Sequence, residues 1–359
     1  MDKPITARAR LAAQHIAGTR FTTAKEVVGW MGAMQAQDFA ACLWAVGIRL
    51  PGSTVADIEK ALDRGEILRT HVLRPTWHLV SADDITWMLA LTAPHIKAGL
   101  KSRHKELGLT ESIVSKSFTI LEMALQGGKH ATRQALIAAF EQAGIATGEN
   151  RASHLLAAAE LESLICSGPT QSGKPTYALL AERVPPAKSL SREEALYTLA
   201  NKYFSSHGPA AYRDFAWWSG LPAGESRLAL ELVKDSLVSE TIEAQTCWWN
   251  PNEIRDSGED SVHLLPAYDE TIIGYQERSA VLPQQDFKKA VSSNGVFHPV
   301  VLVNGQVRGV WKRTMKKDRV EVEVAWFATG NLPEQEATER AAAEYAKFLG
   351  KGNILVADE

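Results

Sequence analysis

Residues 54–80, TVADIEKALDRGEILRTHVLRPTWHLV, contain the pattern that indicates the fold. Thr54 is a suitable N-cap and Asp57 places a carboxylate in the first turn, so a helix is expected to begin here and to end at Gly65. The rest of the stretch has the β-branched and alternating content of two short strands joined around Arg74-Pro75. These strands are expected over 67–72 and 76–80. With two helices before it, the stretch completes the order of a winged helix-turn-helix unit.

The same order of three helices and a hairpin recurs twice, once before and once after the Pro185-Pro186 linker. We therefore predict an α+β fold with three tandem winged helix-turn-helix units, followed by a small β-barrel-like module with a C-terminal helix. The expected boundaries are 1–104, 105–186 and 187–252 for the three units and 253–359 for the module. An ordinary α-rich bundle with three incidental hairpins is the alternative.

The last third of the chain has a different character. Asn304-Gly305 lies between two apolar runs and is a strong hairpin signal, because both residues accept the positive φ that the turn needs. Residues 320–324 alternate strictly between valine and glutamate, as a half-buried strand does. An Ala/Glu-rich helix is expected over 332–349.

Composition limits the class of protein. The 359 residues include no apolar stretch of the roughly 18 residues that a membrane span needs, and the N-terminus lacks the pattern of a signal peptide. Cys42, Cys166 and Cys247 are widely separated and form no C-x-x-C pair. We therefore expect a reduced, cytoplasmic, multidomain protein that does not enter membranes.

The formal net charge is −3, from 39 Lys and Arg against 42 Asp and Glu, which at first argues against a nucleic-acid partner. The basic residues are unevenly distributed, however, and two clusters lie at 97–105 and 312–319. A local basic face is what DNA binding requires, so the prediction is modest, salt-sensitive binding.

One phosphate-binding motif is apparent but not convincing. Residues 168–174, GPTQSGK, fit the spacing G-x-x-x-x-G-K, yet Pro175 occupies the position of the Mg²⁺-binding hydroxyl, and a strand follows instead of a helix. We interpret this segment as a wing turn that presents Lys174 to DNA phosphates. No metal-ligand spacing and no G-x-S-x-G motif is present, which leaves a dispersed Ser/His/Asp arrangement open.

The unusual feature is Met34-Gln35-Ala36-Gln37-Asp38, after an apolar stretch expected to be helical over 27–34. On a helix, residues i and i+2 lie roughly 200° apart, so both amides could not face one site. In an extended segment the same spacing places both on one side. The glutamines can act together only if the helix ends near Met34. From spacing alone, solvated amides at a helix end are the simpler interpretation.

The hairpin of the first unit is rich in hydrogen-bond donors. Trp77 is expected in the core, which would leave Thr76 and His78 pointing out on the other face of the strand. Arg69, His71 and Arg74 would then add a cationic surface suited to phosphate contact. An ordinary wing with satisfied side chains is equally compatible with the pattern.

A third stretch, residues 264–278 (LLPAYDETIIGYQER), has two adjacent carboxylates, Asp269 and Glu270, near Arg278. They could be catalytic, but a structural ion-pair network is the favoured interpretation.

Together these stretches resemble the AlkZ-like family, the azinomycin-resistance and interstrand cross-link DNA glycosylases that contain tandem winged helices and excise bulky alkylated bases. Gln35-Ala36-Gln37 is similar to that family's catalytic Gln-aliphatic-Gln motif. The segments Arg69–His78, Leu264–Arg278 and Val303–Arg313 are similar to other parts of it, so the resemblance spans nearly the whole chain. Asp replaces the second glutamine in another branch, and here Asp38 follows Gln37.

The resemblance implies that Gln35 and Gln37 are catalytic and line a basic channel for duplex DNA. The implied activity is monofunctional hydrolysis of the N-glycosidic bond of N7-alkylated or cross-linked purines, by a monomer without cofactor or metal. A non-catalytic winged-helix regulator and an α-rich adaptor remain as alternatives. The residues expected to contact DNA are Arg69, His71, Arg74, Thr76, His78, Lys174, Arg278, Lys312 and Arg313.

Overall fold

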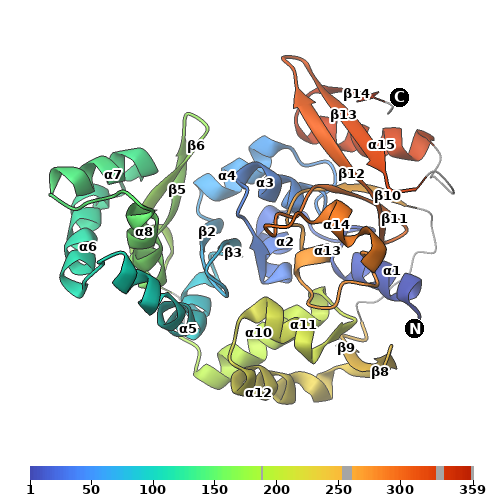
Figure 1. Cartoon of the computed structure of the whole chain (residues 1–359), viewed down its shortest axis with the longest axis horizontal. Helices are drawn as coiled ribbons and strands as arrows, with labels where there is room; N and C mark the ends of the chain where they lie inside the picture. Colours follow the sequence, from blue (N-terminus) through green and yellow to red (C-terminus); the bar gives the residue numbers. More distant parts are fainter. Residues whose placement is uncertain (187–188, 253–260, 329–334, 357–359) are drawn as a thin grey trace.

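Three segments of the chain share one order of elements: a helix, a short strand, two helices and a β-hairpin (Figure 1). In each, the short strand pairs with the second strand of the hairpin, so the three sheets have the same strand order. The computed structural model describes residues 1–186, 189–252, 261–328 and 335–356. The three hairpins lie where the sequence predicts them.

The first segment is preceded by an additional helix and followed by a long one. Its helix α2 has a capping box between Thr23 and Glu26 and ends at Gly32, which has φ +76°. This end is earlier than the expected one, because the next three residues pair with the hairpin as a strand. Its elements are α1 (Lys3–Ala13), α2 (Ala24–Met31), β1 (Ala33–Gln35), α3 (Phe39–Gly47), α4 (Val55–Asp63), β2 (Ile67–His71), β3 (Trp77–Ser81) and α5 (Ile85–Glu106).

The second and third segments repeat this order. The second consists of α6 (Glu111–Leu125), β4 (His130–Thr132), α7 (Arg133–Gln142), α8 (Arg151–Leu161), β5 (Ile165–Gln171), β6 (Lys174–Leu179) and α9 (Leu180–Arg183). The third consists of α10 (Arg192–Ser206), β7 (Ala210–Ala211), α11 (Tyr212–Ser219), α12 (Ala223–Val233), β8 (Val238–Ile242) and β9 (Gln245–Trp249). The glycine-rich 168–174 stretch is the β5–β6 hairpin, as expected, and no helix follows its lysine directly.

The C-terminal part corrects one expectation. Its five strands are hydrogen-bonded in the order β10-β11-β12-β13-β14, and among the described residues no pairing joins β10 to β14. The sheet is therefore open and not barrel-like, because β14 adds to its edge parallel to β13 while α15 packs against β10 and β13. The first residues of the expected helix 332–349 lie outside the described residues. The elements are β10 (Val262–Leu265), α13 (Glu270–Ile273), α14 (Phe287–Ala290), β11 (Val300–Val303), β12 (Gln306–Met315), β13 (Arg319–Trp326), α15 (Gln335–Phe348) and β14 (Gly352–Val356).

The first segment lies in the middle of the molecule, between the other two segments and the C-terminal sheet (Figure 1). It shares one hydrophobic core with the C-terminal sheet, where Trp44 packs against Tyr345 and Phe348 with ring centroids 5.1 and 5.0 Å apart. A second core joins β3 and α5 to the third segment. The second segment has most of its own core and meets the first through polar contacts, including Thr170 N–H to Asp63 at 2.7 Å, and through a small apolar cluster in which Leu161 packs against Ala93 and Ile96 of α5.

Candidate active site

The glutamine motif lies in extended backbone at the end of β1. Gln35 is paired in register with His78 of β3, and the N–H of Ala36 continues the pairing by donating to the Trp77 carbonyl at 2.7 Å. Ala36 is fully buried, whereas Gln35 is partly exposed and Gln37 exposed. β1 ends at Gln35 and the chain bends at Gln37, so the exposures leave both glutamines accessible on either side of the buried Ala36.

Arg69 holds the residue between the two glutamines. Its Nε donates to the Ala36 carbonyl at 2.9 Å, and its guanidinium lies 4.2 Å from the centroid of the Trp77 ring. Arg69 was expected to contact phosphate; in the structure its hydrogen bond is to the motif itself. Removing it would leave the Ala36 carbonyl without this donor and loosen the extended segment.

A buried carboxylate lies directly behind Gln35. Glu270, the first residue of α13, accepts the Gln35 N–H on Oε1 at 2.7 Å and the Trp218 indole N–H on Oε2 at 3.2 Å. Its side chain is 1% exposed. Both oxygens therefore accept from N–H groups that can only donate. The carboxylate therefore fixes the backbone of the motif and places an acceptor-rich group beneath it.

The neighbouring Asp269 belongs to a separate buried network. Arg49 is completely buried and donates to both Asp269 oxygens, at 2.8 and 2.9 Å. Burial alone would raise the pKa of Asp269, but the Arg49 charge and hydrogen bonds from Arg49 and Thr271 hold that pKa below its ordinary value. The partners of Asp269 and Glu270 agree with the interpretation that these two carboxylates have a structural role. No local pattern pointed to Arg49, which lies 220 positions before Asp269.

Arg74 contacts the side chain of the first glutamine. Its Nη2 lies 3.3 Å from Gln35 Oε1, and burial lowers the pKa of its guanidinium from the ordinary value. An amide oxygen has two lone pairs, so Gln35 Oε1 retains one for another donor. Arg74 thereby orients the amide with its carbonyl oxygen held in place.

Two histidines of this hairpin differ from expectation. His78 does not point out: it is completely buried, because its strand lies in the centre of the sheet, between β1 and β2. Burial, with the nearby Arg74 charge, lowers the pKa of His78 well below its usual value. His71 is paired through Nδ1 with the buried Glu160 of α8. The interface with the second segment therefore uses His71, and neither histidine presents a free imidazole to a duplex.

Three other residues that were expected to contact DNA lie apart from one another in the structure. Thr76 is only partly exposed, and its hydroxyl is buried beside the site. Arg278 donates through Nε to the Ile272 carbonyl at 2.9 Å, at the end of α13. Lys174 is exposed at the tip of the second hairpin.

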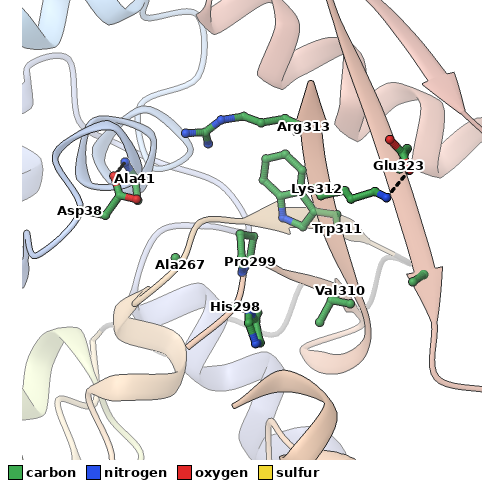
Figure 2. A pocket seen from close by; sticks show the side chains of 11 residues that line it. Asp38, Ala41, Ala267, His298, Pro299, Val310, Trp311, Lys312, Arg313 and Glu323 are labelled. Carbon is green, nitrogen blue, oxygen red and sulfur yellow. Dashed lines mark hydrogen bonds and ion pairs between the residues drawn. The ribbon is translucent and has the colours of Figure 1, made fainter. Parts of the chain in front are cut away.

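Lys312 and Arg313 line a pocket of about 410 Å³ that also includes Asp38, the residue after Gln37 (Figure 2). In this view Arg313 extends toward the start of α3, whereas Lys312 reaches Glu323 at 2.6 Å. Asp38 caps α3 by accepting the Ala41 N–H at 3.0 Å. The structure thus brings a cationic side chain from β12 close to the glutamine motif.

The described residues contain no group of three or more His, Cys, Asp or Glu side chains placed to hold a metal ion. In the same part of the chain, no helix has the length and apolar character for crossing a membrane. All three cysteines are free and buried.

A family model described as "DNA glycosylase AlkZ-like" matches residues 28–348, and the chain belongs to that family. The solved structure of the Streptomyces sahachiroi DNA glycosylase AlkZ is similar in fold, with a TM-score of 0.80 at 20% identity over 99% of this chain and 100% of that one. No curated protein matches the sequence.

Proposed function

We propose that the protein is a monofunctional DNA repair glycosylase that hydrolyses the N-glycosidic bond of bulky or cross-linked N7-alkylated purines. The observation that carries this proposal is that Gln35 and Gln37 are both accessible, on either side of the buried Ala36, in a segment whose backbone is anchored from behind. In a non-catalytic regulator, nothing would require the segment that carries two accessible amides to be anchored in this way.

The chemistry needs little basicity from the protein. An amide cannot remove a proton near neutral pH, but its oxygen accepts a hydrogen bond from water and so orients it. A purine alkylated at N7 is cationic, so its glycosidic bond breaks readily and C1′ becomes positively charged in the transition state. Water held by Gln35 and Gln37 would attack C1′, and the buried Glu270 would favour the positive charge electrostatically. No nucleophilic lysine takes part, and hence no strand cleavage is expected.

Duplex DNA is the proposed partner, bound by a monomer in the cytoplasm. We assign the three repeated segments as winged helices over 1–104, 105–186 and 187–252, and residues 253–359 as the C-terminal module. Lys174 and Arg313 are the exposed or pocket-lining cations best placed to meet phosphates, with Arg74 and Arg278 nearer to the glutamines.

The test is release of 7-methylguanine from methylated DNA and unhooking of a nitrogen-mustard cross-link. Wild type should release base, and Gln35→Ala and Gln37→Ala should each lose at least about 100-fold in single-turnover rate, the scale of a lost positioning group. Gln126→Ala, at an exposed glutamine of the second segment, is the matched control and should be unchanged. Equal activity in all four proteins would refute the assignment. Salt-sensitive DNA binding without base release would instead support the regulator.

A further inference from the structure

Helix α11 presents an unusual tryptophan beside the candidate site. Trp217 is 44% exposed, whereas its neighbour Trp218 is completely buried. Exposed tryptophans are uncommon on protein surfaces and are enriched where a protein binds a partner. Trp217 therefore needs an explanation other than packing of the third segment.

Two arginines flank the Trp217 ring. The guanidinium of Arg74 lies 5.9 Å from the ring centroid, and that of Arg278 lies 5.4 Å from it. Arg74 is also the residue that contacts the Gln35 amide, so a continuous path of side chains leads from the indole to the catalytic motif. The three side chains come from the first segment, the third segment and the C-terminal part.

The backbone holds this arrangement closely. Gly220, which ends α11 with φ +65°, lies so near the first segment that a Cβ there would be 2.4 Å from the Leu73 carbonyl oxygen. The Trp217 indole N–H donates to the Ile273 carbonyl at 3.3 Å, which fixes the ring plane. The indole is thus fixed at one edge, while nearly half of its residue's surface remains exposed.

Arg74 is incompletely hydrogen-bonded. Burial lowers the pKa of both guanidinium groups, and for Arg278 the nearby charge of Arg74 adds to the effect. Arg278 donates to the Ile272 and Gln276 carbonyls, whereas the buried Nε of Arg74 has no hydrogen-bond partner among the described residues. Two neighbouring cations that have lost water favour an anion, and a phosphate diester is the anion that accompanies a nucleobase.

We propose that Trp217, Arg74 and Arg278 form a nucleotide-binding platform, in which the indole stacks on a base and the guanidinium groups hold an adjacent phosphate. The base is an undamaged one that flanks the lesion, because the damaged nucleotide itself is to be placed at the glutamines. The platform deepens the proposed function and rests on it, since its purpose is to position damaged DNA at the glutamines.

The experiment uses a duplex with 2-aminopurine next to an abasic-site analogue that cannot be processed, and the same sequence with 7-methylguanine for rate measurements. Wild type should quench 2-aminopurine by stacking. Trp217→Ala should bind about 10- to 100-fold more weakly and lose the quenching, the range found for single base–aromatic stacks. Trp217→Phe, which keeps an aromatic face, should restore most of both.

Tyr197→Ala removes another exposed aromatic side chain of the third segment and is the matched control. If Trp217→Ala binds and quenches as wild type does while wild type releases base, the platform is overturned and the proposed function stands. If wild type quenches through Trp217 but releases no base, the platform stands and the glycosylase assignment fails. Loss of quenching in Tyr197→Ala as well would overturn the assignment to Trp217.

Discussion

Replacing Asp269 by Asn should destabilise the protein strongly, because it leaves the buried Arg49 without its counter-charge. Arg49 is 0% exposed and makes four hydrogen bonds of 2.7–2.9 Å, two of them to this carboxylate. The remaining two go to a carbonyl and an amide, which carry no charge. Removing one partner of a buried ion pair costs about 3–5 kcal/mol, a large fraction of the roughly 5–15 kcal/mol that stabilises a typical domain.

Chemical denaturation followed by tryptophan fluorescence measures this loss. The matched control is Asp83→Asn, which breaks the exposed pair between Lys25 and Asp83 at 2.8 Å and should cost less than about 1 kcal/mol. Because Arg49 and Thr271 lower the pKa of Asp269, its contribution is present above about pH 4 and is lost as the pH falls through the lowered folded-state pKa. The difference between wild type and variant should therefore shrink in acid.

A difference below about 1 kcal/mol at neutral pH would refute this reasoning, since it would mean that uncharged acceptors alone satisfy Arg49. An undiminished difference at low pH would contradict the electrostatic explanation and leave only a packing effect.

Three further outcomes are expected. Gly220→Ala should lower the free energy of unfolding by more than about 2 kcal/mol, because its φ is positive and the added Cβ would clash with the Leu73 carbonyl. Gly224→Ala, where nothing lies within 4 Å of the added Cβ, should be neutral or stabilising. Equal melting temperatures of the two variants would argue against close docking of α11. Glu270→Gln should slow base release at saturating DNA more than it weakens binding, because the amide cannot accept on both sides and the support of Gln35 is lost; a pure binding defect would count against that role. Burial lowers the pKa of His263 to about 4, so the unfolded state binds more protons than the folded state between pH 6.5 and 4. The free energy of unfolding should therefore fall by about 2–3 kcal/mol as the pH drops across that window. His263→Phe should make this pH dependence less steep, and an unchanged pH profile would show that other groups cause it.

The hairpins and most of the helices were predictable because their signals are local, whereas α3 and α5 were not expected. Caps, apolar periodicity and the Asn304-Gly305 turn each act within a few residues. The short strands β1, β4 and β7 were not, since two or three residues become a strand only by pairing with a distant hairpin. The pairing of β1 with β3 ends the helix before Gln35. From spacing alone, we could predict only that the two glutamines act together if the helix ends near Met34.

The environment of the site depended even more on distant partners. His71 looked like a DNA contact until folding placed Glu160 against it, and Glu270 showed no sign of lying behind Gln35, 235 positions earlier. Trp217 occupies an ordinary position in an apolar helix, and only its exposure and its two arginine neighbours distinguish it. Sequence patterns singled out Gln35-Ala36-Gln37 as a candidate motif, while the residues that hold it in place came together only through long-range packing.

The polar boundary of the second segment has a mechanical consequence. Its contacts with the first segment include Arg69 N–H to Ser167, Asp63 to Thr170 and the His71–Glu160 pair, beside a small apolar cluster of Leu161 with Ala93 and Ile96. A bound polyanion competes for the charges of such polar contacts. A second segment held partly by them would be able to shift against the first when a distorted duplex binds.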